Sequence, residues 1–115
     1  MNSSEIAKLL EGKIITSFSD IHGKVEKAFT SDLMSDVLTL NDCENLVLIT
    51  GLANIQTLRT VEMAGIYCVI LVRGKKASDE MIELAQENET TIIETAYSAF
   101  RTSAVLYNQG IKSLY

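Results

Sequence analysis

The feature that most constrains the fold of this chain is a run of seven apolar residues at 66–72, which follows Gly65 and ends just before Gly74. A second continuous apolar run occupies 46–50 and closes at Gly51. Strands that are apolar on both faces are typical of a parallel sheet covered by helices on both sides. Both runs are far shorter than the roughly 20 residues that a membrane-spanning helix needs. We therefore expect these segments to be the centre of a buried sheet.

Helical patterns with capping residues separate and follow these runs. Asn54, Ser78 and Ser98 are each placed to cap a helix, because their side-chain oxygens can accept a hydrogen bond from a free backbone amide. Apolar residues at helical spacing follow each cap: Ile55, Leu58 and Val61; Met81, Ile82 and Ala85; Phe100, Ala104 and Tyr107. With a short strand expected at 91–93, the order from 46 onward is strand, helix, strand, helix, strand, helix. That order predicts an α/β fold, a three-layer domain with a mostly parallel sheet and βα repeats.

The first forty residues predict further elements of the same kind. Asn2 and Glu5 have the spacing of a capping box for a short helix, which Gly12 can end. Strands are expected at 13–16 and 25–30. Ser31 or Asp32 can cap the next helix, and its apolar residues are Leu33, Met34, Val37 and Leu38.

Composition limits the functions that such a chain can have. It has 115 residues, with no proline and no Gly/Ser-rich linker, so we expect one domain over 1–115. The net charge is -5, and the only dense basic run is Arg73, Lys75 and Lys76. This balance argues against nucleic-acid binding and against docking on an anionic membrane. Two isolated cysteines and no signal peptide at the start of the sequence predict a cytoplasmic protein.

The basic segment at 73–76 precedes the helix that Ser78 is expected to cap. It does not fit a phosphate-binding P-loop, because Val69 stands at the place of the first glycine and Lys76 at the place of the hydroxyl. A helix N-terminus still favours anions, so a phosphate or carboxylate site is one interpretation. The other is a solvated loop whose charges balance the acidic helix that follows.

Ligands of open parallel sheets bind beyond the carboxyl ends of the strands. Polar residues that the predicted order gathers at this edge form our candidate ligand site: Thr50, Gly51, Asn54, Arg73, Gly74, Thr95 and Ser98. Together they could hold a small polar ligand. The alternative is that several of them only cap helices.

No catalytic or metal-binding constellation is recognisable. His22 is the only histidine and has no cysteine at zinc-ligand spacing, so we interpret it as a turn residue. Asp32 and Asp36 lie at helical spacing and could bind a hard cation, but we prefer to interpret Asp32 as a residue near the cap and Asp36 as a surface or interface residue. The sequence therefore predicts no cofactor, no metal and no enzyme activity.

Four segments together resemble the DRTGG domain family, whose fold is similar to the N-terminal domain of HPr kinase. They are Ser-Asp-Leu-Met-Ser-Asp-Val-Leu at 31–38, Asn54 with its following helix, 78–85, and Thr-Ala-Tyr-Ser-Ala-Phe at 95–100. Related domains occur in some phosphotransacetylases and inorganic pyrophosphatases. The resemblance implies a regulatory or dimerising module without catalytic activity. Of the residues for which the family is named, only one glycine is kept here, since Leu52-Ala53 and Val72-Arg73-Gly74 stand at their places.

These observations predict a homodimeric regulatory module that binds a small anionic or nucleotide-like ligand or a partner protein. The alternative is an adaptor that binds another protein and no small molecule. Small stand-alone relatives resemble proteins encoded near iron-hydrogenase genes, which implies a link to that system. Two apolar surfaces are candidates for the dimer contact: the C-terminal Ile111, Leu114 and Tyr115, and the segment with Leu33, Met34, Val37 and Leu38. The alternative for the C-terminal residues is that they pack back on the domain.

Overall fold

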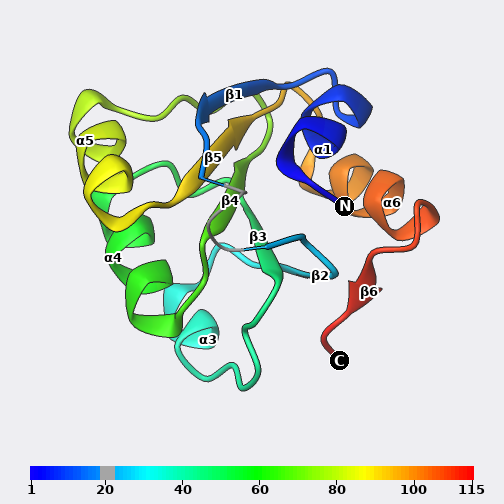
Figure 1. The fold of residues 1–115 in the computed structure, drawn as a ribbon, viewed down its shortest axis with the longest axis horizontal. Coiled ribbons are helices and arrows are strands. Elements are labelled where there is room, and N and C mark those ends of the chain that lie inside the picture. Colours follow the sequence, from blue (N-terminus) through cyan, green and yellow to red (C-terminus); the bar gives the residue numbers. More distant parts are fainter. Residues whose placement is uncertain (19–22) are drawn as a thin grey trace.

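The two apolar runs form neighbouring strands at the centre of a six-stranded sheet (Figure 1). The computed structural model describes residues 1–18 and 23–115, and the sheet order is β1-β5-β4-β3-β2-β6. Its strands are β1 (Lys13–Thr16), β2 (Lys27–Thr30), β3 (Leu46–Thr50), β4 (Cys68–Leu71), β5 (Thr91–Glu94) and β6 (Lys112–Ser113). Every neighbouring pair is parallel except β1 with β5, which is antiparallel.

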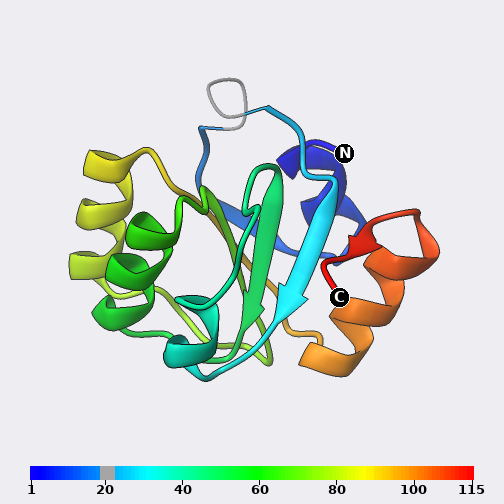
Figure 2. The ribbon, with the colours of Figure 1, turned by 90° about the horizontal axis from the view of Figure 1, so that it is seen from below.

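Helices cover both faces of the sheet (Figures 1 and 2). One face carries α3 (Met34–Val37), α4 (Ile55–Ala64) and α5 (Asp79–Asn88). The other carries α1 (Ser3–Leu9) and α6 (Ala99–Asn108). The prediction of a three-layer α/β fold with a mostly parallel sheet is confirmed.

Two apolar cores lie on the two faces, because successive strand residues point to opposite sides. In β3, Val47 and Ile49 pack with α1 and α6, whereas Leu46 and Leu48 pack with α3, α4 and α5. All five residues of β3 are buried. The continuous apolar runs therefore exist because each strand must supply both cores.

The expected cap of the short helix after β2 is wrong. The N-cap of α3 is Leu33, which makes no side-chain capping bond, and the helix is only four residues long. The Ser31 hydroxyl instead accepts a hydrogen bond from the Leu33 amide, and the Asp32 carboxylate turns toward β3, as described below. Met34 and Val37 are buried while Leu33 and Leu38 are exposed, so this segment does not present all four apolar residues to solvent.

Gly12 does not end α1 in the manner expected. The left-handed residue at the helix end is Glu11, with φ of 48°, and the Gly12 amide donates to the Ala7 carbonyl. A Cβ on Gly12 would lie 2.6 Å from the carbonyl oxygen of Glu94. Glycine is required here by the close approach of the chain to β5.

The C-terminal segment packs back on the domain. Ile111 is buried in the core beside α6, and β6 pairs with the outer edge of β2. Tyr115 is exposed, although its ring makes an edge contact with Phe29 at 6.3 Å between centroids. The expected strand at 25–30 is shortened to β2, with Val25 buried just before it.

Candidate functional site

The carboxyl ends of β2, β3, β4 and β5 lie along one edge of the sheet, where α4, α5 and α6 begin. The three predicted caps are present. The Asn54 side chain accepts a hydrogen bond from the Thr57 amide at 3.2 Å, Ser78 from the Met81 amide at 3.2 Å, and Ser98 from the Arg101 amide at 3.1 Å. Asn54 and Ser98 of the candidate site therefore use their side chains to start helices.

Asp32 occupies the part of this edge at the end of β3. Its Oδ1 accepts hydrogen bonds from the Thr50 hydroxyl at 2.9 Å and from the Gly51 amide at 2.7 Å. An anion would otherwise be the natural partner of these two donors. Thr50 and Gly51 are thus bonded to a carboxylate of the chain itself, and sequence reasoning missed this role. Because β2 and β3 pair with Thr30 opposite Ile49, Asp32 comes level with Gly51, a relation visible only once the strand order is known.

Arg73 and Gly74 form the centre of a tight turn at the end of β4. Their φ angles are 56° and 73°, and the Lys75 amide closes the turn on the Val72 carbonyl. Two left-handed residues in succession are typical of a type I′ turn, which explains Gly74. The Arg73 amide donates to the Tyr97 carbonyl at 2.7 Å and the Gly74 amide to the Thr95 carbonyl. These amides tie two loops together and do not form a cradle for an anion.

Thr95 is also used within the fold. It is buried, its hydroxyl donates to the Leu10 carbonyl at 2.8 Å, and its oxygen accepts from the Tyr97 amide. The contact joins β5 to the end of α1, so Thr95 holds two elements together. Its side chain is not open to a ligand in this arrangement.

Two arginines, Arg73 and Arg101, are exposed at this edge. The Arg101 guanidinium lies over the Tyr97 ring, 3.7 Å from its centroid, and the Tyr97 hydroxyl donates to Glu11 at 2.8 Å. That hydrogen bond is the main reason why the pKa of Tyr97 is raised. Arg73 is exposed and forms no ion pair with any residue that the structure describes.

The two lysines of the basic segment, Lys75 and Lys76, differ in their contacts. Lys76 lies 3.5 Å from the carboxylate of Glu94, which is buried and accepts the Ala77 amide at 2.7 Å. Lys75 is exposed. Within residues 1–18 and 23–115, no group of three or more His, Cys, Asp or Glu side chains is placed to hold a metal ion. His22, predicted to lie in a turn, falls outside the described residues.

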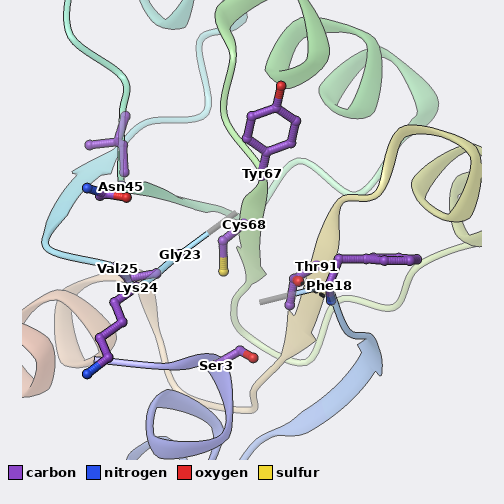
Figure 3. Close-up of a pocket in the computed structure, with 10 residues that line it drawn as sticks. Ser3, Phe18, Gly23, Lys24, Val25, Asn45, Tyr67, Cys68 and Thr91 are labelled. Carbon is purple, nitrogen blue, oxygen red and sulfur yellow. Dashed lines mark hydrogen bonds between the residues drawn. The ribbon is translucent and has the colours of Figure 1, made fainter. Parts of the chain in front are cut away.

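A small cavity lies at the opposite, amino edge of the parallel strands (Figure 3). Its volume is about 30 Å³, enough for one or two water molecules. The sulfur of Cys68 points from β4 toward α1, where the Ser3 hydroxyl is buried with no hydrogen-bond partner among the described residues. Burial raises the pKa of Cys68 to about 12, so its thiol stays protonated. The cavity suits water and is too small for a metabolite.

A larger pocket of about 260 Å³ lies between β2, α6 and the C-terminal segment. Its walls are mainly apolar and include Phe29, Leu106, Tyr107 and Tyr115. None of the residues predicted from the sequence to bind a ligand lines it.

Among the helices that the structure describes, none has the length and apolar character that crossing a membrane requires.

Comparison with known proteins decides the family. The sequence profile of the DRTGG domain matches residues 5–108. The chain belongs to the DRTGG domain family. This DRTGG domain carries the resemblance over nearly its whole length, as the four segments predicted. Among curated proteins, no sequence matches it.

A solved structure has the same fold. It contains the CBS and DRTGG domains of the regulatory region of a Clostridium perfringens pyrophosphatase, in complex with its activator diadenosine tetraphosphate. The TM-score is 0.79 at 20% identity, and the match covers 96% of this DRTGG domain. It covers 47% of the pyrophosphatase chain, so this DRTGG domain spans about half of that chain.

Proposed function

We propose that this DRTGG domain is a regulatory module that binds a small anionic or nucleotide-like ligand and has no catalytic activity of its own. The observation that carries the proposal is the pair of arginines beside Tyr97. Arg73 is tied to the Tyr97 carbonyl through its backbone amide, and Arg101 stacks on the Tyr97 ring. The regulatory region with the same fold binds a nucleotide activator, which supports a ligand of this class.

The stacked arginine suits an anionic ligand. A guanidinium that lies flat on an aromatic ring keeps its N–H donors at the edges of its plane, where they can meet two oxygens of a phosphate. The hydrogen bond from Tyr97 to Glu11 holds the ring, and therefore the guanidinium, in place. Arg73 supplies a second exposed cation from the neighbouring loop, and α6 begins at Ser98 beside both. The site would therefore recognise negative charge through side chains.

Calorimetric titration with ATP, AMP and diadenosine tetraphosphate tests this proposal. We expect one of these nucleotides to bind, and each of Arg73→Ala and Arg101→Ala to weaken it by about tenfold, as for a lost hydrogen bond to a charged group. Arg59→Ala is the matched control, because Arg59 is an exposed arginine on α4. Loss of binding in all three variants alike would contradict the assignment to Arg73 and Arg101. Absence of heat and of any thermal shift with a wider panel of phosphorylated metabolites would overturn ligand sensing.

Regulation through association is the second part of the proposal. A module of this family would act as a homodimer, since a twofold dimer is the commonest assembly. The alternative function is an adaptor that binds another protein, and the exposed apolar side chains of Phe100 and Tyr107 favour a protein contact of some kind. A pull-down that recovers a single partner protein, combined with no nucleotide binding, would support the adaptor.

A further inference from the structure

Helix α6 turns two aromatic side chains to solvent. Phe100 is 86% exposed and Tyr107 is 69% exposed. They are seven residues apart, so they lie on one side of the helix about 10 Å apart along its axis. Ser103 and Ala104, both small, stand between them, whereas the buried side of α6 carries Thr102 and Leu106. We call Phe100, Ser103, Ala104 and Tyr107 the α6 face.

The α6 face has an aromatic residue at each end and two small residues between them, so the order of large and small residues is the same in both directions along the helix. Positions 100, 103, 104 and 107 are symmetric about the midpoint between Ser103 and Ala104. A twofold axis through that midpoint would set two copies of α6 antiparallel, with Phe100 of each copy against Tyr107 of the other. Small residues at the crossing point let two helices approach to about 8 Å. The face is therefore complementary to itself.

The apolar pocket beside α6 extends this complementarity. Tyr107 lines the pocket of about 260 Å³, together with Phe29 and Tyr115, whereas Phe100 does not line it. In the antiparallel arrangement, Phe100 of one copy approaches Tyr107 of the other and so reaches the mouth of that pocket. Each copy would contribute the exposed ring of Phe100 and the apolar pocket beside α6 to the contact.

Charge separates the α6 face from the other helical surface. The chain carries a net charge of -5, yet α6 contains no Asp or Glu. The charged residues that line the groove between α4 and α5 are three glutamates and one arginine, Glu80, Glu83, Glu87 and Arg59, so two copies that met there would bring an excess of carboxylates together. Self-association of an acidic chain is therefore less opposed at α6 than at this groove.

We infer that two copies of this chain associate through the α6 face, with their α6 helices antiparallel across a twofold axis. The inference rests on the proposed homodimer and gives it a surface. Four aromatic side chains at about 150–250 Å² each would bury roughly 600–1,000 Å² in total. Specific interfaces begin near 1,200 Å², so the dimer should be weak and reversible.

Sedimentation velocity over a concentration series tests the surface. We expect the mass of the wild-type chain to rise from 12.7 kDa toward twice that value as the concentration increases. Phe100→Glu and Tyr107→Glu each place a carboxylate in the contact and should raise the dissociation constant at least about tenfold, which is the change that ~1.4 kcal/mol produces. Met63→Glu is the control, because Met63 is 76% exposed on α4 on the other side of the sheet. Circular dichroism establishes that all variants are folded.

A charge-swap variant tests the antiparallel arrangement. Phe100→Lys combined with Tyr107→Glu on the same chain pairs opposite charges twice across the axis, so it should regain part of the association that Tyr107→Glu loses. Failure of this rescue would refute the register. A wild-type chain that stays monomeric at every concentration, or a Phe100→Glu variant that dimerises like wild type, would overturn the surface. Nucleotide titration of Tyr107→Glu separates the two proposals, because Tyr107 lies at the far end of α6 from Arg101 and its replacement leaves both arginines in place.

Discussion

Replacing Asp32 by alanine tests the central structural finding at the carboxyl edge. The substitution removes one oxygen that accepts both the Thr50 hydroxyl and the Gly51 amide. Each such bond contributes roughly 0.5–1.5 kcal/mol, so the expected loss is about 1–3 kcal/mol. For a chain of this size, 1 kcal/mol corresponds to about 4 °C in Tm, which gives a fall of about 4–12 °C. Thr50 is 1% exposed, but Asp32 itself is exposed, so its removal lets water reach these donors and keeps the loss within that range.

Differential scanning calorimetry at neutral pH measures this effect, and two variants make it specific. Asp32→Asn keeps an oxygen that can accept both hydrogen bonds and should lose less than half as much as Asp32→Ala. Asp36→Ala removes an exposed carboxylate from the neighbouring α3 and should stay within about 0.5 kcal/mol of wild type. If Asp32→Ala has the same Tm as Asp36→Ala, the hydrogen bonds of Asp32 do not stabilise this edge and the reasoning is refuted.

Two further variants test the packing of the sheet. Gly12→Ala places a Cβ 2.6 Å from the Glu94 carbonyl and should cost about 1–3 kcal/mol by chemical unfolding, whereas Gly51→Ala meets nothing closer than 3.5 Å and should be tolerated. Equal losses in the two variants would contradict the close approach of β1 and β5. In a Cys43→Ser background, stability should fall as the pH rises from 9 toward 12, because the pKa of Cys68 is raised from 9.0 to about 12 in the folded state and the unfolded thiol ionises first. The same decline in a Cys68→Ala variant would exclude the thiol as its cause.

Features that depend on a few neighbouring residues could be predicted from the sequence. Asn54, Ser78 and Ser98 cap their helices as expected, since a cap needs only the residue and an amide three positions along the chain. The central strands followed from apolar runs that supply both cores. Gly65 ends α4 in the left-handed conformation, with φ of 78°.

Features that depend on distant segments could not be predicted. The position of Asp32 beside Gly51 requires that β2 and β3 be neighbours in a particular register, although β2 alone is compatible with many partners. The antiparallel pairing of β1 with β5 has the same origin. Glu89 takes a left-handed conformation at the end of α5, where no glycine marks the turn, because the next strand begins immediately. In each case the tertiary contact decides the local conformation.

The occupied hydrogen bonds along the carboxyl edge determine where an anionic ligand would be accepted. At the end of β3, the Asp32 carboxylate holds the Gly51 amide and adds negative charge, so a phosphate there would meet repulsion and no free donor. At the ends of β4 and β5, the backbone amides are also used, but Arg73 and Arg101 are exposed there, and Arg101 stacks on Tyr97. The same edge is thus unfavourable for an anion over β3, and the proposed site lies over β5. A ligand bound through Arg101 would contact the first turn of α6, and the α6 face begins in that turn at Phe100. The proposed ligand site and the proposed dimer surface therefore share one helix, which gives a direct route by which binding could change association.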